Sequence, residues 1–470
     1  MFGNIQRDMA YANMATRQTS ATGKSATTYH TGGFRQVSSL VEYQQSPNFW
    51  AQVPLQTVPS FSIGPIATPS TDYNPGVSIS SEGKVLAYAY IDRTTSLPVL
   101  QIYESPKYDY AVTFTNTPAD ATALVLGDIL NDIVITCTIS KDGSTCVLGY
   151  IDNDNGVGAI WTYYNNPSTG WQQTSPTKII PSGITGTKPY FGFSIALSTD
   201  NSTLVVGAPN DGYIIPNDLF IPGAVYVYKL TATAGQYSQF GTKLLGSGVT
   251  DIAYRGFSVG VSATGSLILF SAPYDGYLPP GQPLPKGAVL CFRQSTPSSS
   301  YIQAGPKIES PTSLNYAFGV ALALTSDGTT AYIGAPLAPI SNSESGVYVY
   351  AMAQPSGGDW TRQGFIGVPN SVVGTNSAFG GGIEVSDDGY TVAIASIGDI
   401  ITSTLKGSAY IFSKSENFTY TQNGPKLYNS GLSTSFTNTV ALSADGKVLA
   451  TSGFILDPDR TSFLLVYISL

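Results

Sequence analysis

The chain has 470 residues, of which 42% are hydrophobic and only 11% charged, and its many Gly and Tyr residues favour strands and tight turns over helices. Its net charge of −8 opposes binding to a phosphate backbone, and no run of 18 apolar residues is present to cross a bilayer. We therefore expect an all-β protein that binds no nucleic acid and inserts into no membrane. The N-terminal sequence does not resemble a secretory signal, so we expect synthesis in the cytoplasm without one.

Residues 1–46 are predicted to form an N-terminal arm. They contain no proline, and residues 1–40 carry four basic residues against Asp8, which makes this stretch about +3 and leaves about −11 for the rest of the chain. Apolar residues spaced for one short helical face begin the arm, and the Ser- and Thr-rich sequence after them predicts an extended segment that orders on a neighbouring protein. The candidate anchor residues are Ile5, Arg7, Met9, Met14 and Arg17. A solvated tail is the alternative.

Residues 47–470 contain seven imperfect copies of one unit of about 60 residues. Each copy has a glycine or asparagine in a predicted turn, and these residues follow one another at intervals of 57 to 64 positions: Gly83, Gly143, Asn201, Gly265, Gly328, Gly389 and Gly446. Gly and Asn tolerate the positive φ that hairpin turns require. The pattern therefore predicts seven similar sheets.

Four strands, A to D, are predicted in each copy. Strand A alternates in polarity, as in 193–198, and strand B is an apolar run, as in 204–207. Strand C is rich in aromatic residues, as in 225–228, and strand D carries an aromatic residue, a turn and a lysine followed by aliphatic residues, as in 237–245. These elements predict a seven-bladed β-propeller of four-stranded antiparallel blades.

Small residues recur at fixed places in the copies. They stand early in strand A and directly before a proline after strand B: Gly192, Gly256, Gly319 and Gly380, and then Ala208, Ala272 and Ala335. A bulky side chain at these places would hold neighbouring sheets apart. The positions therefore predict close contact between blades.

The seventh copy supplies only three strands before the chain ends at Leu470. Residues 49–55 resemble the strand D segment 360–366, so we expect the N-terminal segment to pair onto the last blade as its fourth strand. The residues predicted to make this closure are Phe49, Trp50, Val53 and Leu55. Closure would remove an exposed sheet edge, which otherwise invites aggregation.

The third copy contains Phe191-Gly192, then Val206-Gly207-Ala208-Pro209, then the segment 223–228. This arrangement resembles an FG-GAP repeat, the unit of the integrin α-subunit propeller and of many bacterial and viral surface proteins. Matching copies contain Gly256-Phe257, Phe318-Gly319 and Phe379-Gly380, whereas copies one, two and seven are degenerate. The resemblance covers residues 49–470 and implies the propeller fold, but it specifies little about function.

Integrin-type repeats often place a calcium loop of the form D-x-D-x-D-G between strands A and B, where it supplies several oxygen ligands. The corresponding turns here, such as 198–201 and 386–389, offer one or two carboxylates. We therefore expect no structural metal and no other cofactor.

The three cysteines are too few for a disulfide scaffold. A hairpin about 140–143 is predicted to set Cys137 and Cys146 directly opposite each other. This leaves either a disulfide or two buried thiols, and the cross-strand spacing favours the thiols.

No catalytic residue is predicted. The only histidine, His30, lies in the arm, and the sequence has no P-loop and no CxxC pair. A paired-carboxylate hydrolase stays open because 30 Asp and Glu residues are present. Glu384 is distinctive because several other blades have alanine at its place in strand A, and we expect it to face the central channel.

Long loops join strands B and C in the third and fourth copies, and we expect them to emerge side by side on one face. Their aromatic residues supply the amphipathic area that protein interfaces use. The candidate partner-binding residues are Asp211, Tyr213, Phe220, Tyr274, Asp275 and Tyr277. Rigid cover for one end of the propeller is the alternative.

The sequence therefore favours a non-enzymatic structural or protein-recognition module. Its expected partners are other proteins, capsid or surface neighbours, bound through the arm and the B–C loop face. The arm, the expected absence of a signal and the low charge favour a minor or peripheral virion protein, located in a virion or at a cell surface. A bacterial FG-GAP surface adhesin and a propeller glycoside hydrolase or lyase are the alternatives.

Overall fold

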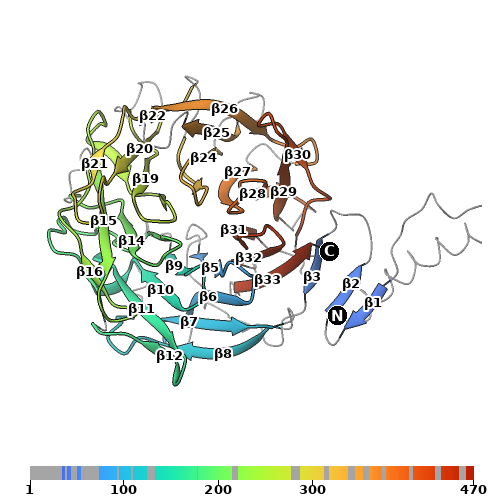
Figure 1. The fold of residues 1–470 in the computed structure, drawn as a ribbon, viewed down its shortest axis with the longest axis horizontal. Helices are drawn as coiled ribbons and strands as arrows, with labels where there is room; N and C mark the ends of the chain where they lie inside the picture. Colours follow the sequence, from blue (N-terminus) through green and yellow to red (C-terminus); the bar gives the residue numbers. More distant parts are fainter. Residues whose placement is uncertain are drawn as a thin grey trace, which may run out of the picture.

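The computed structural model describes residues 34–37, 40–43, 50–53, 73–92, 95–106, 110–123, 133–176, 178–213, 221–276, 286–311, 317–336, 345–352, 359–372, 377–401, 406–428, 436–454 and 462–469. In these residues seven sheets stand around one axis, and each has a four-stranded antiparallel core (Figure 1). The predicted seven-bladed β-propeller is therefore confirmed.

The blades follow one another along the chain. Blade 1 is β5 (Gly76–Ile79), β6 (Val85–Asp92), β7 (Leu97–Glu104) and β8 (Ala111–Asn116), and blade 2 is β9 (Ile133–Ile139), β10 (Thr145–Tyr150), β11 (Ala159–Asn166) and β12 (Gly170–Gln173), with β4 (Tyr73–Asn74) parallel to β9. Blade 3 is β13 (Ser194–Leu197), β14 (Thr203–Ala208), β15 (Ile221–Leu230) and β16 (Tyr237–Gln239), with β17 (Ile252–Arg255) parallel to β15. Blade 4 is β18 (Val259–Val261), β19 (Leu267–Ala272), β20 (Ala288–Arg293) and β21 (Ile302–Gln303), with β22 (Ile308–Glu309) also paired to β20.

The remaining blades complete the ring. Blade 5 is β23 (Leu322–Leu324), β24 (Thr330–Ala335), β25 (Gly346–Met352) and β26 (Trp360–Gly367), and blade 6 is β27 (Phe379–Val385), β28 (Thr391–Ile400), β29 (Lys406–Lys414) and β30 (Tyr420–Gln422). Blade 7 is β31 (Phe436–Leu442), β32 (Val448–Phe454), β33 (Ser462–Ser469) and β3 (Trp50–Val53). The one helical segment in the described residues, α2 (Asn153–Gly156), is a single turn, and no helix there is long and apolar enough to span a bilayer.

The ring closes as the sequence predicts. Strand β3 pairs antiparallel with β33, with Trp50 opposite Ser469 and Val53 opposite Val466, and the two strands lie side by side in Figure 1. The side chains of Trp50 and Ala51 are buried. Phe49 and Leu55, the other two predicted closure residues, lie outside the described residues. Blade 7 therefore takes its outermost strand from the N-terminal part of the chain.

The predicted arm is described only in part. A separate hairpin of β1 (Phe34–Val37) and β2 (Leu40–Tyr43) occupies part of the segment that we expected to be extended. The aromatic and β-branched residues of these two segments suit strands, which explains the difference. The anchor candidates Ile5, Arg7, Met9, Met14 and Arg17 lie outside the described residues.

The seven turns between strands A and B share one geometry. All seven predicted turn residues have positive φ, from +59° at Asn201 to +72° at Gly143 and Gly328. The turn begins with Ser or Thr, whose side-chain oxygen accepts the backbone N–H five positions later, as between Val85 and Ser80 at 3.0 Å and between Val448 and Ser443 at 2.9 Å. The repeat therefore specifies both the backbone and the side-chain bonding of this turn.

The small residues permit backbone contact between blades. A Cβ atom on Gly207 would lie 1.9 Å from the carbonyl oxygen of Gly256 in the next blade, and one on Gly334 would lie 2.1 Å from that of Gly380. Ala208, Ala272 and Ala335 are fully buried. The predicted close contact between blades is confirmed.

The phenylalanine before the glycine of strand A fills the space against strand C. Phe191, Phe318 and Phe379 are fully buried, and each meets the edge or face of a strand C tyrosine at ring-centroid distances of 5.6 to 5.8 Å: Tyr226, Tyr348 and Tyr410. In blade 4 this place is held by Arg255, and the Phe257 of the sequence match comes after the glycine. The Arg255 guanidinium donates to the carbonyl oxygen of Pro222 at 2.8 Å, and burial lowers its pKa.

The cysteines are all buried and free, as the sequence favoured. The expected register was wrong, however, because Cys137 pairs with Leu148 and Cys146 pairs with Ile139. The A–B turn takes up Ser140 to Ser144, with the Ser140 N–H bonded to the carbonyl of Thr145, and this shifts the two cysteines out of opposition. Burial raises the pKa of the Cys137 thiol well above its usual range.

Candidate functional site

Antiparallel connectivity places the loops at two opposite ends of every blade. The A–B turns, such as 80–83 and 386–389, form one end, which we call the A–B face. The B–C loops and the connections from strand D to the next strand A form the other end, which we call the B–C face. The predicted partner-binding residues belong to the B–C face, and Glu384 lies on the inner strand β27 that leads to the A–B face.

Asp211 lies at the centre of a buried network on the B–C face. Its carboxylate accepts the Tyr226 hydroxyl at 2.5 Å, the Thr185 hydroxyl at 2.7 Å and the Lys243 ammonium at 3.0 Å. The Asp211 side chain is completely buried, and its negative charge helps to raise the pKa of Tyr226 beyond the effect of burial. Such a carboxylate fixes the start of its B–C loop to two other segments of the blade.

Two other blades repeat this arrangement. In blade 4, Asp275 accepts the Lys307 ammonium at 2.6 Å and the Thr250 N–H at 2.8 Å. Burial opposes the charge of Lys307, but its bonds to Asp275 and Glu309 outweigh burial and raise the lysine pKa. In blade 6, a carboxylate that the sequence analysis did not single out, Asp399, binds Ser408, Tyr410 and Lys426.

These contacts correct the role predicted for two residues. Asp211 and Asp275 are 1% and 3% exposed, so neither carboxylate is presented to a partner. Each carboxylate forms an ion pair with a lysine of its own blade that lies 32 residues later in the chain. The recurring lysine of strand D was visible in the sequence, but its pairing with the B–C loop aspartate was not inferred.

The aromatic residues of the B–C face divide into three groups. Tyr274 is 36% exposed, and its ring centroid lies 4.8 Å from that of Tyr254, which the sequence analysis did not single out. Tyr213 is half-buried. Phe220 and Tyr277 lie outside the described residues. Of the four aromatic candidates, the structure therefore presents Tyr274 at the surface, and it adds Tyr254.

The backbone around this tyrosine pair is held in place. Tyr254 has a φ of +55°. The residues at the same place in other blades also have positive φ values close to this one: Tyr190, Ala317 and Ala378. The loop that carries Tyr274 is bonded through the Asp275 carboxylate to Thr250 and Lys307. A partner would thus meet an aromatic surface that is already ordered, which lowers the entropic cost of binding.

The A–B face is joined into a network by backbone hydrogen bonds between turns. The backbone N–H of the second residue of one turn donates to the carbonyl oxygen of the second residue of the next turn. These bonds run from Asp387 to Ala444 at 2.9 Å, from Ala444 to Ser81 at 3.0 Å, and from Ser81 to Lys141 at 2.8 Å. A second series runs from Ala263 to Ser326 at 2.7 Å. These bonds draw the turns of blades 6, 7, 1 and 2, and those of blades 4 and 5, toward the axis.

Side chains from blades that are not neighbours also meet on this face. The Lys141 ammonium of blade 2 lies 2.8 Å from the Asp387 carboxylate of blade 6, and the hydroxyls of Thr199 and Ser326, in blades 3 and 5, are 3.4 Å apart. Contacts of this kind require the turns to converge near the axis. The A–B turns of blades 2 and 6, and those of blades 3 and 5, are therefore in contact with each other.

Glu384 lies on β27, three residues before Asp387. Its side chain is half-buried, and burial raises its pKa from 4.5 to about 7, while the charge of Lys141 and the backbone N–H of Val385 favour the ionised form. The same strand A position is Ala323 in blade 5 and Ala441 in blade 7. The expectation that Glu384 faces the central channel stays a prediction.

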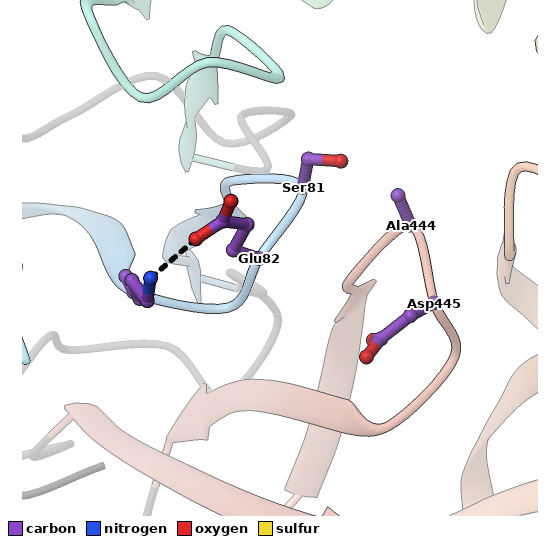
Figure 2. A pocket seen from close by; sticks show the side chains of 5 residues that line it. Ser81, Glu82, Ala444 and Asp445 are labelled. Atoms are coloured by element: carbon purple, nitrogen blue, oxygen red, sulfur yellow. Dashed lines mark hydrogen bonds and ion pairs between the residues drawn. The ribbon is translucent and has the colours of Figure 1, made fainter. Parts of the chain in front are cut away.

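A shallow pocket lies between the A–B turns of blades 1 and 7 (Figure 2). Ser81 and Ala444 form its sides, and the carboxylates of Glu82 and Asp445 stand on the two turns. Lys84 pairs with Glu82, and the Asp445 carboxylate accepts the Ser443 hydroxyl of its own turn at 2.7 Å. In the described part of the chain, no three His, Cys, Asp or Glu side chains converge as metal ligands would.

Comparison with known proteins identifies the fold and not a family. No family model matches the chain, and no curated protein matches it. A solved structure from Bacteroides uniformis, described as a "putative 6-phosphogluconolactonase", is similar with a TM-score of 0.51 and 13% identity over 80% of this chain and 88% of that one. A protein from Lactobacillus plantarum has a TM-score of 0.48 and 13% identity over 77% of this chain and 86% of its own. At such identity the likeness concerns the propeller fold alone.

Proposed function

We propose that this protein is a non-enzymatic recognition module that binds another protein through the B–C face around Tyr254 and Tyr274. The observation that carries this proposal is the exposed Tyr274, which packs on the half-buried Tyr254 of β17 and lies on a loop fixed by the Asp275 ion pair with Lys307. Tyrosine offers a large amphipathic contact area with few rotatable bonds, which is why it is common at the centres of protein interfaces. The absence of a catalytic role in this proposal is supported by Asp211, Asp275 and Asp399, whose buried carboxylates bind lysines within their own blades.

The module is further proposed to serve as a minor or peripheral component of a virus particle. Support for this part comes from the sequence: the basic N-terminal residues on an acidic body suit docking on an acidic neighbour. A bacterial surface adhesin with FG-GAP repeats would use the same face in the same way. A virion component and a surface adhesin differ in where the protein is located, but both would use the same recognition surface.

The recognition surface is tested by site-specific photo-crosslinking in the native source. A benzophenone amino acid at position 274 should give one discrete adduct with a second protein, because the side chain lies at the centre of the proposed interface. The same amino acid at position 390 is the control, since Tyr390 is 53% exposed but belongs to an A–B turn. Equal adducts at both positions, or none at 274, would contradict the proposal.

A propeller hydrolase or lyase is the second candidate, and Glu384 favours it. A half-buried carboxyl with a pKa near 7 has the property of a general acid, and Asp387 supplies a second carboxylate from the adjoining turn. Against it, Asp387 is bound to Lys141. Incubation with a glycan array tests this candidate: cleavage that is lost in the Glu384→Gln variant would support it, and an intact array would oppose it.

A further inference from the structure

We propose that Arg255 is a positioning residue that joins the B–C loops of blades 3 and 4 into one recognition surface. The proposal rests on the proposed function of the B–C face and adds the residue that sets the two loops relative to each other. Arg255 is the last residue of β17 and directly follows Tyr254, and it is 6% exposed. At this exposure Arg255 acts through the backbone that it binds and not by contact with a partner.

The guanidinium of Arg255 bonds three backbone carbonyl oxygens from two segments. It donates to Pro222, at the start of β15 where the B–C loop of blade 3 ends, at 2.8 Å. It also donates to Val249 and Thr250, in the connection from blade 3 to blade 4, at 3.2 and 3.4 Å. Arg255 therefore fixes the end of one loop to the segment that leads into the next blade.

Thr250 extends this connection to the B–C loop of blade 4. Its N–H donates to the Asp275 carboxylate at 2.8 Å, and its hydroxyl oxygen accepts the N–H of Gly276 at 3.0 Å. The N–H of Tyr274 also donates to the carbonyl oxygen of Ala253 in β17, at 3.4 Å. One continuous series of hydrogen bonds thus runs from the blade 3 loop through the guanidinium to the blade 4 loop.

The backbone at this junction differs from that at the preceding one. Here β17 pairs in parallel with β15, and the Ile221 N–H donates to the carbonyl oxygen of Asp251 at 3.0 Å. Between blades 2 and 3 the same contact is a single bridge from Gly158 to Phe191. Arg255 stands at the place of Phe191, so the longer strand pairing coincides with the change from phenylalanine to arginine.

Stability does not explain an arginine at this place. Three other blades hold a fully buried phenylalanine here: Phe191, Phe318 and Phe379. Within the described residues the Arg255 Nε has no hydrogen-bond partner, and burial lowers the pKa of the guanidinium more than the charges of Asp275 and Asp251 raise it. Replacing a buried charge by a well-packed apolar residue is often neutral or stabilising. The arginine is therefore explained by the placement of the two loops.

Arg255→Phe tests this role on the full chain, because it introduces the residue that blades 3, 5 and 6 have. Its melting temperature should stay within about 3 °C of the wild type. Residue-level hydrogen exchange should nevertheless show the Ile221 amide about tenfold less protected, since the charged donor that holds β17 beside β15 is lost. The Val225 amide, which bonds the Leu244 carbonyl oxygen at 3.1 Å further along β15, is the internal control and should keep its protection.

Photo-crosslinking shows whether this placement matters for recognition. With the benzophenone amino acid at position 274, the adduct should be largely lost in Arg255→Phe, because the two loops no longer form one ordered surface. The control Arg293→Leu removes an arginine from the opposite end of the same blade and should leave the adduct unchanged. If the wild-type background gives no adduct at 274, the proposed function fails, whereas the Ile221 and Val225 amides still decide the role of Arg255.

Two results would overturn the proposal: equal protection of the Ile221 amide in the wild type and in Arg255→Phe, or an adduct at 274 that Arg255→Phe does not reduce. Joint loss of protection at Ile221 and Val225 with a lower melting temperature would also overturn it, because it indicates a general structural role. If Arg255→Phe fails to fold, Arg255→Lys decides by the same measurements. Lysine keeps the charge but lacks the planar fork that bonds three carbonyl oxygens, so the Ile221 amide alone should lose protection.

Discussion

The Lys243 ammonium lies 3.0 Å from the Asp211 carboxylate, although 32 residues separate them in the chain. Asp211 begins a B–C loop and Lys243 follows strand D, so the pair fastens the outer part of the blade to the loop at its end. The same relationship joins Asp275 to Lys307 and Asp399 to Lys426. The B–C face is therefore supported from inside by three buried carboxylates.

Removal of one such carboxylate should lower the free energy of unfolding. In Asp211→Ala, Lys243 and the Tyr226 hydroxyl lose their partner, and breaking a buried pair from one side typically costs about 3 to 5 kcal/mol. We expect the free energy of unfolding in urea to fall by about 3 kcal/mol. The matched control Asp359→Ala, at an exposed position before β26, should change it by less than about 0.5 kcal/mol. Similar small losses in both variants would show that the network does not stabilise the blade.

Contact between blades should not tolerate a single methyl group at Gly207. In Gly207→Ala the new Cβ would lie 1.9 Å from the Gly256 carbonyl oxygen, which belongs to the backbone of the next blade. We expect little soluble protein, or a melting temperature several degrees below that of the wild type, since overpacking of this kind costs about 1 to 3 kcal/mol or more.

Gly241→Ala is the control for that substitution. Gly241 has a φ of +69° but no atom within 4 Å of an added Cβ, so it reports the backbone cost alone, about 1 kcal/mol. If Gly207→Ala were no worse than Gly241→Ala, the blades would not be in the predicted backbone contact.

The three cysteines should behave as buried thiols. Burial raises the pKa of Cys137, Cys146 and Cys291, and the thiolate is the reactive form. A thiol reagent added without reductant should label all three in denaturant and label them slowly in the native protein. Recovery of a single reactive thiol in denaturant would instead indicate a disulfide between two of them.

Closure of the ring should depend on β3. Deletion of residues 45–57 removes the strand that pairs with β33 and exposes both its edge and the side of blade 7 against which Trp50 packs. We expect an insoluble protein or a much lower melting temperature. Deletion of residues 1–33 leaves β3 in place and should have little effect on the melting temperature. An unchanged melting temperature after the first deletion would contradict the role of β3.

The sequence predicts most of the fold because each blade repeats the same local chemistry. The turn glycines, the aromatic strand C and the small residues at blade contacts all depend on residues close together in one copy. The closing strand was also predictable, since Trp50 and its neighbours share the pattern of strand D. The register of one hairpin was predicted wrongly, because its turn is two residues longer than expected and this separates Cys137 from Cys146.

The candidate site was harder to predict because it depends on distances between copies. Asp211 looked like a surface residue in a long polar loop, and only the folded blade brings Lys243 to it. Lys141 and Asp387 lie in turns of blades 2 and 6, and a linear pattern does not show which turns meet across the axis. Tyr254 was missed because it lies two residues before the glycine of strand A, a place occupied by alanine in blades 5 and 6.

The central claim, recognition of another protein by the B–C face, is tested most directly by measuring how much of the protein accompanies the native assembly. Quantitative mass spectrometry of purified particles should find the wild-type chain at a fixed ratio to the other components. The Tyr274→Ser variant should fall well below that ratio, and Tyr390→Ser should remain at it. A soluble monomer that is absent from every particle and cleaves a glycan would contradict the account.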